Sequence, residues 1–255
     1  MSVSIYFHQL KEQEVDRTWD EIMSGEFKVG IESELERLEK EEKELVAKIP
    51  VLEDPSFSYY SKDPAYAAYA EASAKHVAVE DQLKKLQGLK HWEQDTITFK
   101  KQFDQATELD EELEQAIMDM NRSIIAHFSE QDFTEYYSHH AWDDYIRVLF
   151  GATLNIDIEK QDYYKEDGIP GIPFELWVKA FESADKVNMM AIKGLAADFD
   201  FTFEDFTDHI LPVKNLVKFC RDTNTKMIVY FEYPYSHFEE KRAKGMYLKY
   251  KSKNF

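Results

Sequence analysis

Cysteine is almost absent from this sequence, since Cys220 is the only one among 255 residues. A single thiol cannot form a disulfide bond within the chain, and it cannot supply the several thiolates of a structural zinc site. We therefore expect the protein in a reducing compartment, the cytoplasm. Long apolar runs are missing too: no stretch approaches the ~20 apolar residues that span a bilayer, and residues 1–7 lack the basic start of a signal peptide. We expect no interaction with a membrane.

Glycine and proline are also scarce, with eight and seven residues. Barrels and sandwiches of many strands need frequent turns, which these two residues supply, so the composition argues against an all-β fold. The phosphate-binding loop, the dinucleotide fingerprint, the nucleophile elbow and the zinc-protease motif are all missing from the sequence. Nucleotide hydrolases and Rossmann dehydrogenases are therefore disfavoured.

Basic residues are outnumbered, because 31 Lys and Arg face 50 Asp and Glu and leave a formal charge of −19. Such a chain repels the phosphate backbone, which argues against direct binding of nucleic acid. Hydrophobic residues make up 44% of the sequence and aromatic residues 15%, which is enough for a folded protein with a charged surface. Residues 1–150 hold 33 acidic and 16 basic residues, whereas residues 151–255 hold 17 and 15. We expect two regions on either side of residue 150, with different surfaces.

Apolar residues at helical spacing dominate the acidic region of residues 1–150. A heptad-like seam predicts a long amphipathic helix over residues 27–49, and a second helix begins near Tyr66 and continues to about Leu89. We expect the two to form an antiparallel hairpin. Residues 93–128 carry apolar side chains every three or four positions without proline or glycine, which predicts one helix on the order of 50 Å long. Such a helix needs the hairpin, or a second copy of the chain, to cover its apolar stripe.

Short strands are expected beside this helical body, in a mixed region over residues 151–255. Residues 226–233 are apolar on both faces, which predicts the central strand of a sheet. Residues 2–7 are rich in β-branched and aromatic side chains and are expected to join that sheet, as is a returning strand over residues 245–250. Residues 154–159 alternate between apolar and polar side chains, the pattern of a half-exposed strand. The predicted fold class is α+β, predominantly helical, with long N-terminal antiparallel helices followed by a smaller mixed region with a short sheet.

Residues 133–150 are unusually aromatic and predict a helix that ends at Gly151. On such a helix Glu135, His139 and Asp143 follow one another at intervals of four residues and share one face. Imidazole and carboxylate groups at this spacing can hold Zn²⁺ or Fe²⁺ when a facing helix adds ligands. The solvated side of an amphipathic helix has the same pattern. We therefore keep a metal-dependent hydrolase with this site as an alternative function.

Acidic side chains crowd two of the expected helices and form the main candidate binding surface. Such arrays can imitate a phosphate backbone or meet a basic protein, whose approach they accelerate electrostatically, although most charged helix faces are simply solvated. Two tyrosines in the proline-containing segment between the hairpin helices are candidate aromatic anchors of an interface. The candidate binding residues are Glu34, Glu41, Glu108, Glu111, Glu112, Tyr59 and Tyr60.

The leading hypothesis is a non-enzymatic acidic binding protein without a resident cofactor. It would engage or inhibit a basic protein, as an immunity protein, an antitoxin or a nucleic-acid mimic does. The hypothesis depends on the uneven charge and on the missing catalytic motifs. The alternatives are the hydrolase with Zn or Fe, and a structural homodimer in which residues 93–128 pack against their symmetry mate.

Overall fold

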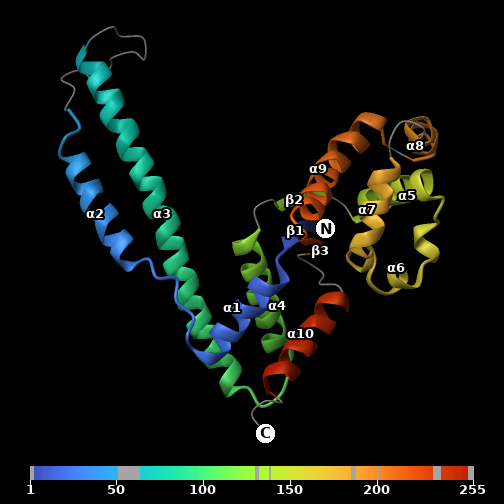
Figure 1. The fold of residues 1–255 in the computed structure, drawn as a ribbon, viewed down its shortest axis with the longest axis horizontal. Helices are drawn as coiled ribbons and strands as arrows, with labels where there is room; N and C mark the ends of the chain where they lie inside the picture. The colour runs from blue at the N-terminus through green and yellow to red at the C-terminus, as the bar shows by residue number, and fades with distance from the viewer. Residues whose placement is uncertain are drawn as a thin grey trace. The chain divides into compact units, whose positions relative to one another are not determined.

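The computed structural model describes residues 3–50, 64–129, 132–137, 139–184, 188–199, 201–231 and 237–251. Helices dominate these residues and three strands form one small sheet, which confirms a predominantly helical α+β fold (Figure 1). The strands are β1 (Val3–Leu10), β2 (Asp132–Tyr137) and β3 (Lys226–Phe231). The helices are α1 (Glu12–Ser24), α2 (Glu32–Val46), α3 (Pro64–Gln105), α4 (Glu111–Phe128), α5 (His139–Leu154), α6 (Asp162–Asp167), α7 (Phe174–Ser183), α8 (Asn188–Ala196), α9 (Phe203–Asp222) and α10 (His237–Lys251), with short 3-10 helices η1 (Ile158–Lys160) and η2 (Ile169–Gly171).

The chain divides into two compact units. Residues 24–101 form one, here called the hairpin unit, and residues 1–23 with 102–255 form the other, here called the sheet unit. The boundary that we expected at residue 150 was based on charge, and the backbone divides elsewhere, since α5 runs through residue 150 without a break. The hairpin unit carries 16 acidic and 12 basic residues, and the sheet unit carries 34 and 19. Most of the excess negative charge therefore belongs to the sheet unit.

In the hairpin unit α2 and α3 lie side by side (Figure 1). Leu38 of α2 packs against Val79 and Leu83 of α3. The Glu42 carboxylate, one turn further along α2, lies 3.8 Å from the His76 imidazole, which is one turn earlier on α3. The two helices are therefore antiparallel, as the sequence predicted.

α3 is one continuous helix of 42 residues, so the predicted end near Leu89 and the predicted helix over residues 93–128 are wrong. The break comes later, between Gln105 and Glu111. There the Asp110 carboxylate accepts a hydrogen bond from the Leu113 N–H at 2.8 Å and caps the first turn of α4. Apolar spacing continues across this break, and periodicity alone could not locate it.

Replacing Asp110 by alanine should lower the free energy of unfolding by about 1 kcal/mol, because the Leu113 N–H loses its acceptor at the start of α4. Asp110→Asn keeps a side-chain oxygen and should lose only a few tenths of that amount. Urea unfolding followed by circular dichroism measures both. An equal loss in the two variants would show that the charge of Asp110, and not its capping hydrogen bond, stabilises this helix end.

β1 lies in the middle of the sheet, whose strand order is β2-β1-β3, and it runs antiparallel to both neighbours. The sequence predicted residues 226–233 as the central strand, and this is wrong because β3 lies at an edge. Five of the six side chains of β3 are buried, although among the described residues β1 is the only strand that pairs with it. Other elements pack on both faces of the sheet and bury these side chains. An edge strand can therefore be as apolar as a central one.

The two faces of the sheet are packed differently. Ile5 and Phe7 of β1 belong to the main hydrophobic core, with side chains of α5, α7 and α9. The opposite face carries stacked rings, since the Tyr230 ring centroid is 5.4 Å from those of both Tyr6 and His8. Fully buried members of the main core include Trp142, Ile146, Phe150, Trp177, Val213 and Leu216.

The predicted helix over residues 133–150 is also wrong at its start and at its end. Residues 132–137 form β2, which pairs with β1, and α5 then runs from His139 past Gly151 to Leu154. Aromatic residues suit a strand as well as a helix, and the choice here depends on a partner strand distant in the sequence. Asn155 follows the helix in the left-handed conformation, with φ 54°. An asparagine thus takes the position where the sequence suggested a glycine.

Two further segments predicted as strands have other structures. Residues 154–159 contain the end of α5, three residues without regular secondary structure and the start of η1, and residues 245–250 lie within α10. α10 packs against α4, with Ala243 and Tyr250 buried at helical spacing. Residues 154–159 alternate between apolar and polar side chains over so few residues that the helical period is hidden. Residues 245–250 are mostly apolar and aromatic, a composition that suits a strand as well as a helix.

The start of α9 has a capping signal that is visible in the sequence, since Thr202 and Asp205 stand three residues apart. Thr202 and Asp205 form a capping box, in which each side chain binds the other residue's backbone N–H. The spacing of these two side chains is a strictly local signal.

Candidate functional site

Three of the predicted acidic residues surround the start of α4 in the sheet unit. Glu108 precedes the helix, and Glu111 and Glu112 stand in its first turn. All three are exposed, and among the described residues no basic side chain forms an ion pair with them. Their charge also complements the positive end of the α4 dipole, which gives them a structural role as well. We call these three residues the acidic α4 surface.

The other two predicted glutamates, Glu34 and Glu41, have their negative charge compensated by a neighbouring arginine. In the hairpin unit, the Arg37 guanidinium binds Glu34 and Glu41 at 2.7 Å each. Its hydrogen bond lowers the pKa of Glu34 below the ordinary value. The sequence carried a signal for this pairing, because Arg37 lies three residues after Glu34 and four before Glu41. The five glutamates therefore do not form one set, and Tyr59 and Tyr60 lie outside the described residues.

The predicted metal ligands do not share a helix. Glu135 belongs to β2 and His139 is the first residue of α5, and the side chains of both lie outside the described part of the chain. Asp143 is described, and its carboxylate accepts a hydrogen bond from the Tyr164 hydroxyl at 2.5 Å. Burial, and then this hydrogen bond, raise the pKa of Tyr164 far above its ordinary value. Among the described residues, no group of three or more His, Cys, Asp or Glu is arranged to hold a metal ion.

Cys220 lies buried in α9. Burial raises the pKa of its thiol to about 11, while a hydrogen bond with Thr225 opposes that shift. A thiol with this pKa carries almost no thiolate at neutral pH, so Cys220 is poorly suited to nucleophilic chemistry.

A cleft of about 640 Å³ opens in the sheet unit beside β3. It is bounded by the edge strand β3, by the beginning of α1 and by residues 170–175, which join η2 to α7. The sequence analysis did not predict that these three segments lie around one space. The glycine and proline residues around η2 indicated only that the chain bends there. We call this space the β3 cleft. Its lining residues are Leu10, Glu12, Val15, Asp16, Pro170, Gly171, Ile172, Pro173, Phe174, Glu175, Lys226, Met227, Ile228, Val229 and Arg242.

The charges of the β3 cleft are only partly balanced. Lys226 of β3 binds the Glu12 carboxylate at 3.0 Å. Arg242 of α10 donates a hydrogen bond to the Asn121 side-chain oxygen at 3.3 Å, and burial lowers its pKa. Asp16 and Glu175 are exposed, and no described side chain forms an ion pair with either of them.

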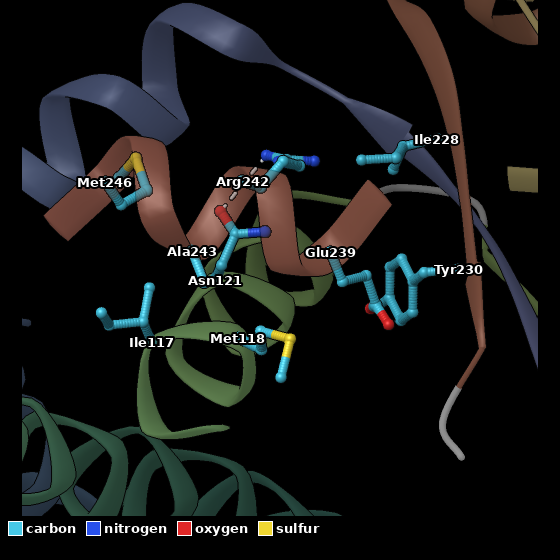
Figure 2. A pocket seen from close by; sticks show the side chains of 9 residues that line it. All are labelled: Ile117, Met118, Asn121, Ile228, Tyr230, Glu239, Arg242, Ala243 and Met246. Carbon is cyan, nitrogen blue, oxygen red and sulfur yellow. Dashed lines mark hydrogen bonds between the residues drawn. The ribbon is translucent and has the colours of Figure 1, made fainter. Parts of the chain in front are cut away.

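Arg242 also borders a much smaller cavity between β3, α4 and α10 (Figure 2). Figure 2 shows its guanidinium directed toward Ile228, with Asn121 of α4 hydrogen-bonded to it. The cavity has a volume of about 10 Å³, which is room for one water molecule at most. It is lined by apolar side chains together with Tyr230, Glu239, Asn121 and Arg242. We therefore regard this cavity as part of a packed polar layer and not as a ligand site.

A buried ion pair holds the same layer together. The Nε of Arg122 donates a hydrogen bond to one carboxylate oxygen of Glu239 at 2.9 Å, and its Nη2 donates to the other at 2.8 Å. The same Nη2 also donates to the Phe231 carbonyl oxygen at 2.7 Å. Its central carbon is 5.2 Å from the centroid of the Tyr230 ring. The side chains of Arg122 and Glu239 are only 15% and 7% exposed. This pair joins α4 to α10 and to the end of β3.

No helix among the described residues combines the length and the apolar composition that crossing a membrane requires. Comparison of the chain with models of known families, with curated proteins and with solved structures found no match.

Proposed function

We propose that this protein is a non-enzymatic acidic binding protein that engages a basic protein through the acidic α4 surface. The observation that carries the proposal is the contrast between two sets of glutamates. Arg37 compensates Glu34 and Glu41, whereas Glu111 and Glu112 have no ion pair among the described residues. Uncompensated charge is what a basic partner would meet during its approach.

The physical effect of such a surface is mainly kinetic. Exposed carboxylates contribute little binding energy one at a time, about 0.2–1 kcal/mol for each ion pair. Together they steer a partner of opposite charge and raise the association rate. The excess of 34 acidic over 19 basic residues in the sheet unit extends this field beyond the three carboxylates. An immunity protein or an antitoxin that neutralises a basic nuclease would use charge in this way.

The proposal predicts steep salt dependence. Proteins from an extract of the source cells are captured on the immobilised chain, and the affinity of the captured partner is measured by titration calorimetry. Between about 0.1 M and about 1 M salt the Debye length falls from ~10 Å to ~3 Å. We expect a basic partner whose affinity falls by tenfold or more over this range. A partner that is acidic, or whose affinity does not change with salt, would contradict the proposal.

A matched pair of variants tests the surface itself. Glu111→Gln with Glu112→Gln should weaken binding of that partner by up to about tenfold, because it removes two uncompensated charges. Glu34→Gln with Glu41→Gln removes the same formal charge from glutamates that Arg37 already compensates, and it should change the affinity much less. Equal effects of the two double variants would place the interface elsewhere.

A further inference from the structure

We infer that the β3 cleft binds an extended, basic segment of a partner protein, which pairs with the free edge of β3. The inference does not depend on the acidic α4 surface, which involves other residues.

The size of the cleft suits a bound segment. Its volume of about 640 Å³ falls within the range of about 300–1,000 Å³ that is typical of binding pockets. Three different parts of the sheet unit form its walls. Apolar side chains of these walls, among them Val15, Ile172 and Phe174, can accept apolar side chains of a ligand.

The position of β3 determines what kind of segment fits. The four consecutive residues Lys226, Met227, Ile228 and Val229 all line the cleft. Successive side chains of a strand point to opposite faces, so a cavity over one face would contact only alternate residues. Contact with consecutive residues means that the cleft follows the edge of the strand. This edge faces away from β1, and outside the β1 ladder no backbone hydrogen bond of the described residues reaches positions 227–229.

An edge strand presents a row of backbone donors and acceptors that another extended chain can pair with. Strand addition of this kind takes its affinity from main-chain hydrogen bonds and its specificity from pockets for alternate side chains. A compact small molecule would leave this row unused. An extended peptide is therefore the occupant that matches both the edge and the apolar walls.

The rim of the cleft selects the charge of that peptide. Lys226 is bound to Glu12, and Arg242 is bound to Asn121 and interacts electrostatically with the carboxylates of Glu239, Asp16 and Glu12. Asp16 and Glu175 remain exposed without an ion pair among the described residues. Lysine or arginine side chains of a bound segment would complement these two carboxylates.

The test uses a fluorescent peptide of about eight alternating lysine and valine residues, with binding to the full chain followed by fluorescence anisotropy. Two control peptides accompany it: one carries glutamate in place of lysine, and one carries N-methyl groups on alternate amides, which cannot donate to a strand. We expect only the unmodified basic peptide to bind. Hydrogen exchange should then slow at residues 227–229. Equal binding of the N-methylated peptide, or protection elsewhere alone, would overturn the inference.

Two charge-reversal variants separate this site from the acidic α4 surface. Asp16→Lys with Glu175→Lys should weaken peptide binding by about tenfold or more, because two attractive contacts become repulsive. Glu111→Lys with Glu112→Lys makes the same change of net charge on the acidic α4 surface and should leave peptide binding nearly unchanged. If both double variants weaken peptide binding equally, the attraction is non-specific. If neither double variant changes peptide binding, the rim does not select the charge of the peptide. Either result overturns the inference without bearing on the partner that the acidic α4 surface binds.

A second copy of the chain is the competing occupant. Sedimentation measurements with and without the peptide distinguish it, because a dimer paired through β3 would dissociate as the peptide binds. We expect no change of mass on addition of peptide. A dimer that the peptide dissociates would overturn the assignment of a foreign basic segment.

Discussion

Replacing Trp177 by alanine should lower the free energy of unfolding by about 3–5 kcal/mol. The side chain is fully buried in α7. Its ring meets Phe7 of β1 edge-on, with centroids 6.1 Å apart, and Phe150 of α5, with centroids 5.5 Å apart. Removing the indole leaves a cavity among three elements whose backbones cannot all move inward, because β1 is held by strands on both sides.

Urea unfolding followed by circular dichroism measures this loss. Trp177→Phe keeps an aromatic ring and should lose less stability than the alanine variant. Leu211→Ala is the control on α9, because this side chain is 49% exposed and its removal should change stability by no more than about 0.5 kcal/mol. A loss below about 1 kcal/mol for Trp177→Ala would mean that the core around this tryptophan is much looser than the structure shows.

Breaking the buried ion pair should have a comparable effect. Glu239→Ala leaves the Arg122 guanidinium buried beside Tyr230, with the Phe231 carbonyl and an exposed Asp119 as its remaining oxygen partners among the described residues. Removing one partner of a buried ion pair typically costs about 3–5 kcal/mol, and we expect a loss of that size. The expected loss comes from the unpaired charge and not from the pair's own net contribution.

A double variant separates these two causes. Arg122→Met with Glu239→Leu removes both charges and fills similar volume, so it should be considerably more stable than Glu239→Ala alone. Arg37→Met, which removes an exposed cation from Glu34 and Glu41, should cost no more than about 1 kcal/mol and serves as the surface control. Additive losses in a double-mutant cycle would show that Arg122 and Glu239 do not interact.

The excess negative charge follows the division into two compact units and not the boundary that we expected at residue 150. Residues 24–101 contain a crowded acidic helix, yet their basic residues largely compensate it, partly through neighbours such as Arg37. The residues that carry the excess negative charge fold together in the sheet unit, although the hairpin separates them in the sequence. Counting charge along the chain could not show this, because residues 1–23 join residues 102–255 only through the fold.

Sequence alone determined the elements whose signals are local. The seam of α2 and the capping box of Thr202 and Asp205 could be predicted, because each depends on residues a few positions apart. The antiparallel pairing of α2 with the start of α3 was inferred from two consecutive amphipathic helices. The predominance of helix followed in the same way from scarce glycine and proline. The shortage of catalytic motifs and the negative charge are direct properties of the sequence, and they led to the hypothesis of an acidic binding protein.

Tertiary structure alone decided the features that depend on distant partners. β2 is a strand because β1 offers it a free edge, although its aromatic sequence also suited a helix. β3 lies at an edge because β1 takes the centre, and α10 is a helix that packs against α4 where the local sequence was equally compatible with a strand. The β3 cleft exists because α1, β3 and residues 170–175, far apart in the sequence, lie around one space. A local sequence pattern shows the periodicity of the apolar side chains in a segment. Which elements the segment packs against depends on contacts with residues far away in the sequence, and a short stretch of sequence does not contain that information.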